Sequence, residues 1–265
     1  MPLCASRKEA IADMELIYSR PKTLAPRVSA YCPGCLHALA TKIIAEVIEE
    51  MDIADNTIMV PPVGCGGNTK RMIDVDVVSA THGRAHAVAS GISRCVPDKL
   101  VFTYQGDGDC AAIGLSETLC AANRGDNFVG IFINNSTYGM TGGQMAPTTL
   151  VGQTSTTTPC GRNAATEGYP MHMCELVNQL KAPRYIARFA LNDPANIHKA
   201  KEGIRHAFEL QQKHIGFCFI ELLTNCPTNW GMTPVKSLEH MKEYTMKEFV
   251  PGVFRDEERS VADDK

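Results

Sequence analysis

The chain has 265 residues, of which 44% are hydrophobic and 21% are charged, and its formal net charge is −3. This composition is ordinary for a globular protein, and the weak acidic balance argues against a nucleic-acid partner. No apolar run approaches the roughly 18 residues of a membrane-spanning helix, and residues 1–26 lack the apolar core of a signal peptide. We therefore expect a cytoplasmic protein with no membrane partner.

The first part of the chain predicts an arm, a helix and a strand. Residues 1–27 are charged and include Pro21 and Pro26 near their end, so they are expected to form a leading arm, with Cys4 in a mobile terminus. Apolar residues then recur at three- and four-residue spacing, which predicts a helix that begins near Gly34. These residues are Leu36, Leu39, Ala40, Ile43, Ile44, Val47, Ile48 and Met51. A short strand is predicted over 57–60.

The rest of the chain alternates between predicted helices and strands. Helices are expected over 85–95, 112–124, 171–181 and from 192 to about 214, and strands over 99–105, 128–134, 184–189 and 215–223. Residues 136–170 are rich in Gly, Thr and Pro and have no period; loops of this length are commonly functional. Residues 237–249 form an amphipathic segment, and the charged end after it is expected to be frayed.

This alternation predicts an α/β fold, a parallel sheet with helices on both faces. No internal repeat is present in the sequence. One domain is therefore expected over residues 28–235, followed by a C-terminal helix and tail over 236–265.

Polar residues follow two of the predicted strands. Gly106-Asp107-Gly108-Asp109 comes directly after strand 99–105, and Asn134-Asn135 ends strand 128–134. The glycines let the backbone approach phosphate groups without a Cβ in the way. A carboxylate and an amide oxygen at the ends of neighbouring parallel strands are ligands that Mg²⁺ prefers. The alternative is that both segments are turns that cap strands.

Eleven cysteines are unusual for a chain of this length. A cytoplasmic protein keeps its thiols reduced, so a disulfide framework is not expected. Five of the cysteines lie in apolar stretches and are expected to be small core residues. They are Cys95, Cys110, Cys120, Cys174 and Cys218.

Four other cysteines form a pattern that is typical of a metal site. Cys32 and Cys35 form a C-x-x-C pair before a helix, which alone fits a redox dithiol, half a zinc site or an iron–sulfur ligand pair. Cys65 and Cys226 each follow a strand, at the sheet edge where α/β proteins bind ligands. One tight pair with two distant singles suits a [4Fe–4S] cluster, since structural zinc more often uses two pairs. Cys160 is a rival fourth ligand and ranks below Cys226.

These motifs carry a family resemblance. Gly106-Asp107-Gly108 with Asn134-Asn135 resembles the thiamine diphosphate-binding signature. The continuation Asn135-Ser136-Thr137-Tyr138-Gly139-Met140-Thr141-Gly142-Gly143-Gln144 is similar to the β subunit of 2-oxoacid:ferredoxin oxidoreductases, and so is Tyr31-Cys32-Pro33-Gly34-Cys35. The resemblance covers about residues 25–255.

The resemblance implies three cofactors. Mg²⁺ would be held by the side chains of Asp107 and Asn135 and by the backbone carbonyl of Thr137, and would bind thiamine diphosphate. One [4Fe–4S] cluster beside the thiamine ring would be held by Cys32, Cys35, Cys65 and Cys226. The other residues expected at the cofactor are Gly106, Gly108, Asp109, Tyr138, Gly139, Met140, Thr141, Cys65, Gly66 and His82.

The tripeptide His82-Gly83-Arg84 opens a predicted helix. An arginine there can pair with phosphate or carboxylate, and backbone amides at a helix start favour anions. The family carries a similar tripeptide near the cofactor, so His82 and Arg84 are expected to be catalytic. The alternative for His82 is a histidine that caps the helix by bonding to a turn carbonyl.

The resemblance also implies an activity and partners. The reaction would be the oxidative decarboxylation of a 2-oxoacid, usually with coenzyme A to give an acyl-CoA, with electrons passing through the cluster to ferredoxin. No glutamate lies in a motif that would bind the cofactor's aminopyrimidine. In this family an alpha subunit binds the pyrimidine half, and gamma and ferredoxin-like delta subunits are also expected.

Two other functions fit part of the sequence. A subunit of a non-redox thiamine diphosphate-dependent decarboxylase or synthase would share the magnesium motif, but it has no use for the four cysteines. A non-catalytic electron carrier or scaffold would not need both Asp107 and Asn135. The 2-oxoacid is not identified by the sequence. Gly142 stands where a lysine would suit a second carboxylate, which disfavours 2-oxoglutarate, although Lys70 or Arg71 could substitute.

Overall fold

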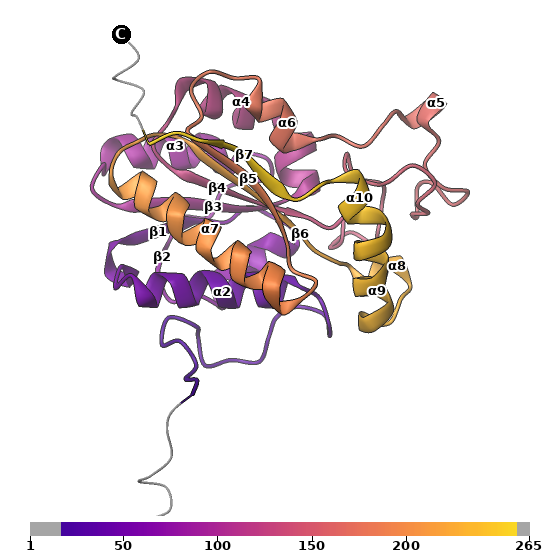
Figure 1. The fold of residues 1–265 in the computed structure, drawn as a ribbon, viewed down its shortest axis with the longest axis horizontal. Helices are drawn as coiled ribbons and strands as arrows, with labels where there is room; N and C mark the ends of the chain where they lie inside the picture. The colour runs from indigo at the N-terminus through magenta and orange to yellow at the C-terminus, as the bar shows by residue number, and fades with distance from the viewer. Residues whose placement is uncertain (1–16, 259–265) are drawn as a thin grey trace, which may run out of the picture.

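The computed structural model describes residues 17–258, so Cys4 and residues 259–265 of the predicted tail lie outside the described part. A seven-stranded sheet with strand order β2-β1-β3-β4-β6-β5-β7 forms its centre (Figure 1). Neighbouring strands run parallel except β5 and β7, which are antiparallel. The strands are β1 Thr57–Val60, β2 Asp76–Val77, β3 Leu100–Gly106, β4 Val129–Asn134, β5 Tyr185–Ala190, β6 Cys218–Leu223 and β7 Gly252–Asp256. The predicted α/β fold is confirmed.

Helices alternate with the strands along the chain. The α-helices are α2 His37–Glu50, α3 Ala85–Cys95, α4 Leu115–Arg124, α5 Ala164–Glu167, α6 Met173–Asn178, α7 Pro194–Gln212, α8 Pro227–Trp230, α9 Pro234–His240 and α10 Met246–Glu248. The start of α7 shows how the sequence sets a boundary. The Asp193 carboxylate accepts a hydrogen bond from the backbone N–H of Asn196 at 2.9 Å, and Pro194 occupies the first turn.

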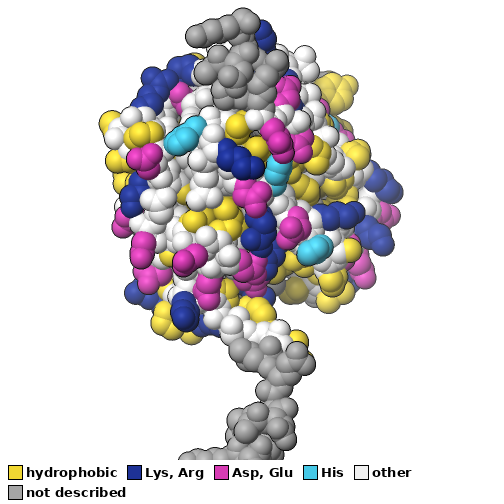
Figure 2. Space-filling model, turned by 60° about the vertical axis from the view of Figure 1, so that its left-hand side comes forward, with side chains coloured by type: hydrophobic (Ala, Val, Ile, Leu, Met, Phe, Trp, Pro, Cys, Tyr) yellow, Lys and Arg dark blue, Asp and Glu magenta, His cyan; other side chains and the backbone are white. Residues whose placement is uncertain are grey.

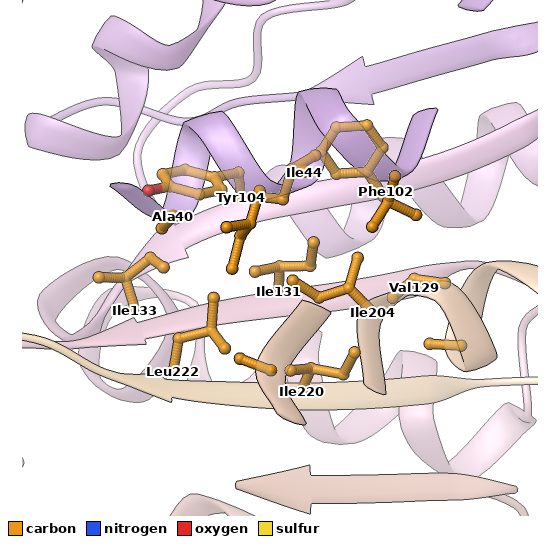
Figure 3. Packing of buried hydrophobic residues seen from close by; sticks show 14 of the residues in the cluster. Ala40, Ile44, Phe102, Tyr104, Val129, Ile131, Ile133, Ile204, Ile220 and Leu222 are labelled. Carbon is orange, nitrogen blue, oxygen red and sulfur yellow. The ribbon is translucent and has the colours of Figure 1, made fainter. Parts of the chain in front are cut away.

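The helices cover both faces of the sheet. Helices α2 and α7 lie on one face, and α3, α4 and α6 lie on the other (Figure 1). Strand β3 shows the alternation: Phe102 and Tyr104 pack in the first layer and Val101 packs in the second, and all three are fully buried. Figure 3 shows Ile44 of α2 and Ile204 of α7 among the buried side chains of the central strands β3, β4 and β6. Each such side chain contributes about 1.5–3 kcal/mol by burial, which is why the central strands are apolar on both faces.

The C-terminal tail differs from the expectation of a frayed end. Residues 252–256 form β7, which pairs with β5 and places Val253 opposite Ala187. The prediction was wrong because this strand carries few apolar residues, and 56% of Val253 stays exposed. Pairing with the edge of the sheet, and not its own hydrophobic pattern, therefore forms the strand.

The cysteines expected in the core fall into two groups. Cys110, Cys174 and Cys218 are buried, as predicted, but Cys95 and Cys120 are exposed. The prediction for these two was wrong because each lies outside the buried face of its helix, α3 or α4. An apolar stretch does not specify which face of a helix is buried.

The surface carries charges of both signs. On the face drawn in Figure 2, basic and acidic side chains are interspersed among patches of apolar atoms. Within residues 17–258, no helix is both long enough and apolar enough to span a lipid bilayer.

Candidate functional site

Four neighbouring strands end at one edge of the sheet, and each delivers a predicted site residue. The strand order places β1, β3, β4 and β6 side by side and parallel. Cys65 follows β1, Asp107 follows β3, Asn135 follows β4 and Cys226 follows β6. Ligands of open α/β sheets bind outside the carboxyl ends of the strands, so the fold gathers these residues where a cofactor would lie.

A hollow of about 100 Å³ opens at this edge. It is lined by His37, Val63, Gly64, Cys65, Gly66, His82, Gly106, Asp107, Gly108, Asp109, Asn135, Thr137, Tyr138, Gly139, Met140 and Thr141. The structure thus brings together every residue predicted at the cofactor. Sites for whole small molecules typically measure about 300–1,000 Å³. The hollow therefore suits one end of a cofactor, with the remainder bound elsewhere.

Asp107 and Asn135 meet at the backbone of Thr137. The Thr137 N–H donates to Asp107 Oδ2 at 3.0 Å and to Asn135 Oδ1 at 3.3 Å. The Thr148 hydroxyl donates to the same Asp107 oxygen at 2.8 Å, and the Gly108 N–H donates to Asp107 Oδ1 at 2.9 Å. Two side-chain oxygens are therefore held close together by the backbone, as a hard cation requires.

The Asp107 carboxyl group is almost completely buried. Burial raises its pKa to about 6, and the hydrogen bonds from Thr148, Gly108 and Thr137 offset only part of that rise. A buried carboxylate without a cation nearby is unfavourable, whereas a divalent cation would stabilise the ionised form. The donor set of Asp107, Asn135 and Thr137 therefore fits Mg²⁺.

Two glycines in the motif act in different ways. A Cβ at Gly106 would meet no atom within 4 Å, so it would project into open space at the hollow. A Cβ at Gly108 would lie 2.0 Å from the Tyr138 ring, so that ring requires a glycine there. Only Gly106 matches the expected role of leaving room for a phosphate group.

Asp109 links His82 to the sheet. Its Oδ1 accepts hydrogen bonds from the Gly83 N–H at 2.7 Å and from His82 Nδ1, and its Oδ2 accepts one from Gln105 at 2.5 Å. Since Nδ1 is engaged by the carboxylate, Nε2 is the ring nitrogen of His82 that remains for another group. Arg84 is placed differently, because it pairs with Glu117 and does not line the hollow.

A π-helical turn precedes α4. The predicted helix over 112–124 begins as α4 only at Leu115, because Asp109–Ile113 forms a wider turn. That turn brings the Gly83 carbonyl within 2.4 Å of where a Cβ at Gly114 would lie. Such turns are frequent at functional sites, and this one carries the Asp109 carboxylate that bonds His82.

A second hollow of about 210 Å³ holds the four predicted cysteine ligands. It is lined by Ala30, Tyr31, Cys32, Cys35, His37, Cys65, Asn68, Asn135, Gly139, Met140, Cys226, Pro227, Thr228 and Asn229. A Cβ at Gly139 would lie 3.2 Å from the Cys65 sulfur and 3.8 Å from the Cys226 sulfur. Cys160 is exposed and does not line this hollow.

The chemistry of these thiols fits an iron–sulfur cluster. Burial, and secondarily the charges of neighbouring cysteines, raise the pKa of Cys35 to about 12 and that of Cys65 to about 11. A cationic cluster would stabilise the thiolates instead. Within residues 17–258, no three or more His, Cys, Asp or Glu side chains converge as ligands of one metal ion. A [4Fe–4S] cubane does not require its ligands to converge on one ion, because each thiolate binds a different iron atom.

The two hollows adjoin. The residues that line both are His37, Cys65, Asn135, Gly139 and Met140. His37 is fully buried, its Nδ1 lies 2.9 Å from the Tyr104 hydroxyl, and burial lowers its pKa to about 4. A neutral histidine thus stands in the shared wall.

Thr148 and Asn229 are among the residues at the site that were not predicted from the sequence. Thr148 bonds Asp107 from the long irregular segment, and the amide of Asn229 donates to Cys226 Sγ at 3.2 Å and to the Gly139 carbonyl at 3.0 Å. The unusual length of segment 136–170 was the one signal for Thr148. Nothing in the sequence marks Asn229 beyond its place three residues after Cys226.

Known proteins resemble this chain over most of its length. Residues 63–222 match the family model for the C-terminal TPP-binding domain of thiamine pyrophosphate enzymes. Subunit VorA of ketoisovalerate oxidoreductase from Methanothermobacter thermautotrophicus is 45% identical over 91% of this chain, which spans 50% of that relative's length. Subunit KorB of 2-oxoglutarate synthase from Archaeoglobus fulgidus is 36% identical over 80% of this chain and 75% of its own length.

A solved structure shares the fold. The 2-oxoglutarate:ferredoxin oxidoreductase from Magnetococcus marinus, with 2-oxoglutarate, coenzyme A and succinyl-CoA bound, superposes with a TM-score of 0.75. It is 24% identical and covers 91% of this chain and 86% of its own chain. The family model and the curated relatives show that this chain belongs to the thiamine diphosphate-binding subunits of the 2-oxoacid:ferredoxin oxidoreductase family.

Proposed function

We propose that this chain is the thiamine diphosphate-binding subunit of an enzyme that oxidatively decarboxylates a 2-oxoacid. A 2-oxoacid and coenzyme A would give CO₂ and an acyl-CoA, and the two electrons released would pass singly through a [4Fe–4S] cluster to oxidised ferredoxin. The observation that carries this proposal is the pair of adjoining hollows. One holds Asp107 and Asn135, and the other holds the four thiols, with Cys65 in the wall between them.

The chain's own residues would position the cofactor and move protons. Asp107 and Asn135 would supply side-chain oxygens to Mg²⁺ and Thr137 its backbone carbonyl, and the ion would fix the diphosphate. Thiamine diphosphate supplies the carbanion chemistry when it is bound. Asp109 holds His82 through Nδ1, so that Nε2 could exchange a proton with a reacting group.

Partner subunits would complete the site. The hollow of about 100 Å³ is small for a whole cofactor, which supports binding of the pyrimidine half by an alpha subunit. Val63 and Met140 line the hollow yet are 52% and 53% exposed, as residues covered by a partner would be. A ferredoxin-like delta subunit would carry electrons onward to ferredoxin, and a gamma subunit would complete the assembly.

The four thiols favour this function over a non-redox decarboxylase or synthase. An enzyme without electron transfer has no use for Cys32, Cys35, Cys65 and Cys226 around one hollow. The protein should therefore be brown when it is prepared without oxygen, with broad absorbance at about 400 nm. A colourless protein that still binds thiamine diphosphate would favour the non-redox alternative.

The lining of the cofactor hollow favours a 2-oxoacid with an uncharged side chain. Among the described residues that line it, none is lysine or arginine, so this chain offers no cation for a second carboxylate. Gly142 has no side chain that could carry a charge. Lys70 and Arg71, the two alternative cations, are exposed and do not line the hollow. A 2-oxoacid such as ketoisovalerate has no second carboxylate and would not need such a cation.

A substrate panel tests the proposal. The full chain, co-purified anaerobically with its partner subunits, is supplied with coenzyme A and a viologen dye as electron acceptor. We expect dye reduction with ketoisovalerate or pyruvate, and a kcat/KM at least about tenfold lower with 2-oxoglutarate, the effect of leaving one charge unpaired. Dye reduction with none of the 2-oxoacids would contradict the proposed activity, and a preference for 2-oxoglutarate would contradict the proposed substrate class.

A further inference from the structure

A buried ion pair lies on β6 and β5, the two strands that follow β4 in the sheet, and β4 is the strand that leads to Asn135. Arg188 of β5 and Glu221 of β6 are paired in register on neighbouring strands, and Arg188 Nε donates to Glu221 Oε2 at 2.8 Å. Both side chains are completely buried. Buried ion pairs are weak evidence for stability, because well-packed apolar side chains often serve as well. The position of this pair therefore calls for another explanation.

Hydrogen bonds connect the pair to the segment that carries Asn135. Glu221 Oε1 accepts a hydrogen bond from Asn134 Nδ2 at 2.7 Å. The other side of the same amide, Asn134 Oδ1, accepts the Ser136 N–H at 3.2 Å. Glu221 can only accept and the Ser136 N–H can only donate, so the Asn134 amide has one orientation that satisfies both. An unbroken series of hydrogen bonds thus runs from Arg188 through Glu221 and Asn134 to the backbone N–H of Ser136, the residue after Asn135.

The backbone at Ser136, where this series of hydrogen bonds ends, is strained. Ser136 has a φ of +58°, a conformation that residues other than glycine rarely adopt. The turn at Ser136 separates Asn135 from Thr137, the two residues proposed to offer oxygens to Mg²⁺. Strain of this kind persists only where surrounding contacts hold it. The hydrogen bond from Ser136 to Asn134 is one such contact.

We propose that Glu221 is a positioning residue for the Mg²⁺–diphosphate site. Held by Arg188, it orients the Asn134 amide, which in turn holds the Ser136 turn and aims Asn135 and Thr137 at the cation. The inference rests on the proposed function, because it assumes that Mg²⁺ and thiamine diphosphate bind here. Residues that orient metal ligands in this way typically affect metal affinity about 10–100-fold.

Three variants separate positioning from stability. Glu221→Gln would offer an N–H to either Arg188 or Asn134, both of which are donors, so one bond must fail. Asn134→Ala keeps the ion pair and cuts the link to the turn. The matched control is Glu175→Gln, because the half-exposed Glu175 of α6 bonds the same guanidinium at 2.9 Å and is not part of the series of hydrogen bonds that reaches Ser136.

Calorimetric titration of Mg²⁺, with saturating thiamine diphosphate, provides the readout on the full chain co-purified with its partner subunits. We expect Glu221→Gln and Asn134→Ala each to raise the half-saturating Mg²⁺ concentration at least about tenfold, and Glu175→Gln to change it less than about twofold. Melting temperatures of the cofactor-free variants report stability independently of that readout.

Two results would overturn the inference alone. One is a folded Asn134→Ala variant with wild-type Mg²⁺ dependence, and the other is a Glu175→Gln variant that loses as much affinity as Glu221→Gln. A wild-type complex that binds neither Mg²⁺ nor thiamine diphosphate would instead overturn the proposed function itself. The two failures are therefore distinguishable.

Discussion

The side-chain oxygens of Asp107 and Asn135 share one hydrogen-bond donor, the backbone N–H of Thr137, at 3.0 Å and 3.3 Å. These residues follow neighbouring parallel strands, β3 and β4, so the shared donor is a direct result of strand order. A cation that bound both oxygens would lie at the open end of the sheet, beside Gly106.

Replacing Asp107 by Ala should abolish activity and spare the cluster. The variant lacks the carboxylate proposed to hold Mg²⁺, so dye reduction should fall at least about 100-fold, the usual scale for losing electrostatic stabilisation in an active site. Absorbance at about 400 nm should persist, because the four cluster cysteines are unchanged. Unchanged turnover in this variant would refute the magnesium assignment.

The fourth cluster ligand is tested by a pair of cysteine variants. Cys226→Ser should lose most of its iron, because Cys226 lines the hollow of the other three thiols. Cys160→Ser should keep wild-type iron, because Cys160 is exposed and lies away from that hollow. Iron analysis of anaerobically purified protein measures both, and the reverse pattern would make Cys160 the ligand.

His82 and Arg84 should differ in their effect on turnover. His82 lines the cofactor hollow and is oriented by Asp109, so His82→Gln should lower kcat by about 10²–10⁴-fold, the usual scale of general acid–base catalysis. Arg84 pairs with Glu117 away from the hollow, so Arg84→Gln should change kcat less than about threefold, since exposed ion pairs contribute little. An equal loss in both variants would show that Arg84 has the catalytic role that the sequence predicts.

His86 should make the stability of the chain depend on pH. Burial lowers its pKa from the usual 6.5 to about 3, so it is neutral in the folded chain and protonated in the unfolded chain between those values. Protons then favour unfolding, and the free energy of unfolding should fall as pH drops through this window, by about 1.4 kcal/mol per pH unit from His86 alone. Urea denaturation of the full chain at several pH values measures this slope.

A histidine variant isolates that contribution. His86→Gln should reduce the slope of unfolding free energy against pH by about 1.4 kcal/mol per unit, whereas His198→Gln, at an exposed position on α7, should leave the wild-type slope. The account of His86 fails if its replacement does not alter the slope.

The fold was predictable from the sequence where burial is one-sided or complete. Strands β3 and β4 are apolar on both faces because helices cover both. The predicted range of β3 differs from the structure by one residue at each end, and that of β4 by one residue at its start. Strand β7 was not predictable, because Val253 and its neighbours form a strand only against β5. The π-helical turn at Asp109–Ile113 was also missed, since its i to i+5 pattern leaves no mark in the hydrophobic period.

The site was predictable to the extent that strand ends determine it. Parallel strands bring Cys65, Asp107, Asn135 and Cys226 to one edge whatever the loops do. Thr148 reaches the site from a long loop, and Asn229 reaches it from the single turn of helix α8, and neither segment has a hydrophobic periodicity that predicts its position. Arg84 shows the limit of a motif: it lies only two residues after His82 in the sequence, yet it pairs with Glu117 outside the hollow.

The central claim is that one sheet edge holds a magnesium–diphosphate site beside an iron–sulfur cluster. Elemental and vitamin analysis of the full chain, purified anaerobically with its partner subunits, tests it most directly. We expect about one thiamine diphosphate and one Mg²⁺ per copy of this chain, and about four irons lost on Cys226→Ser replacement. Wild-type protein that contains neither thiamine diphosphate nor any iron bound through Cys226 would contradict it.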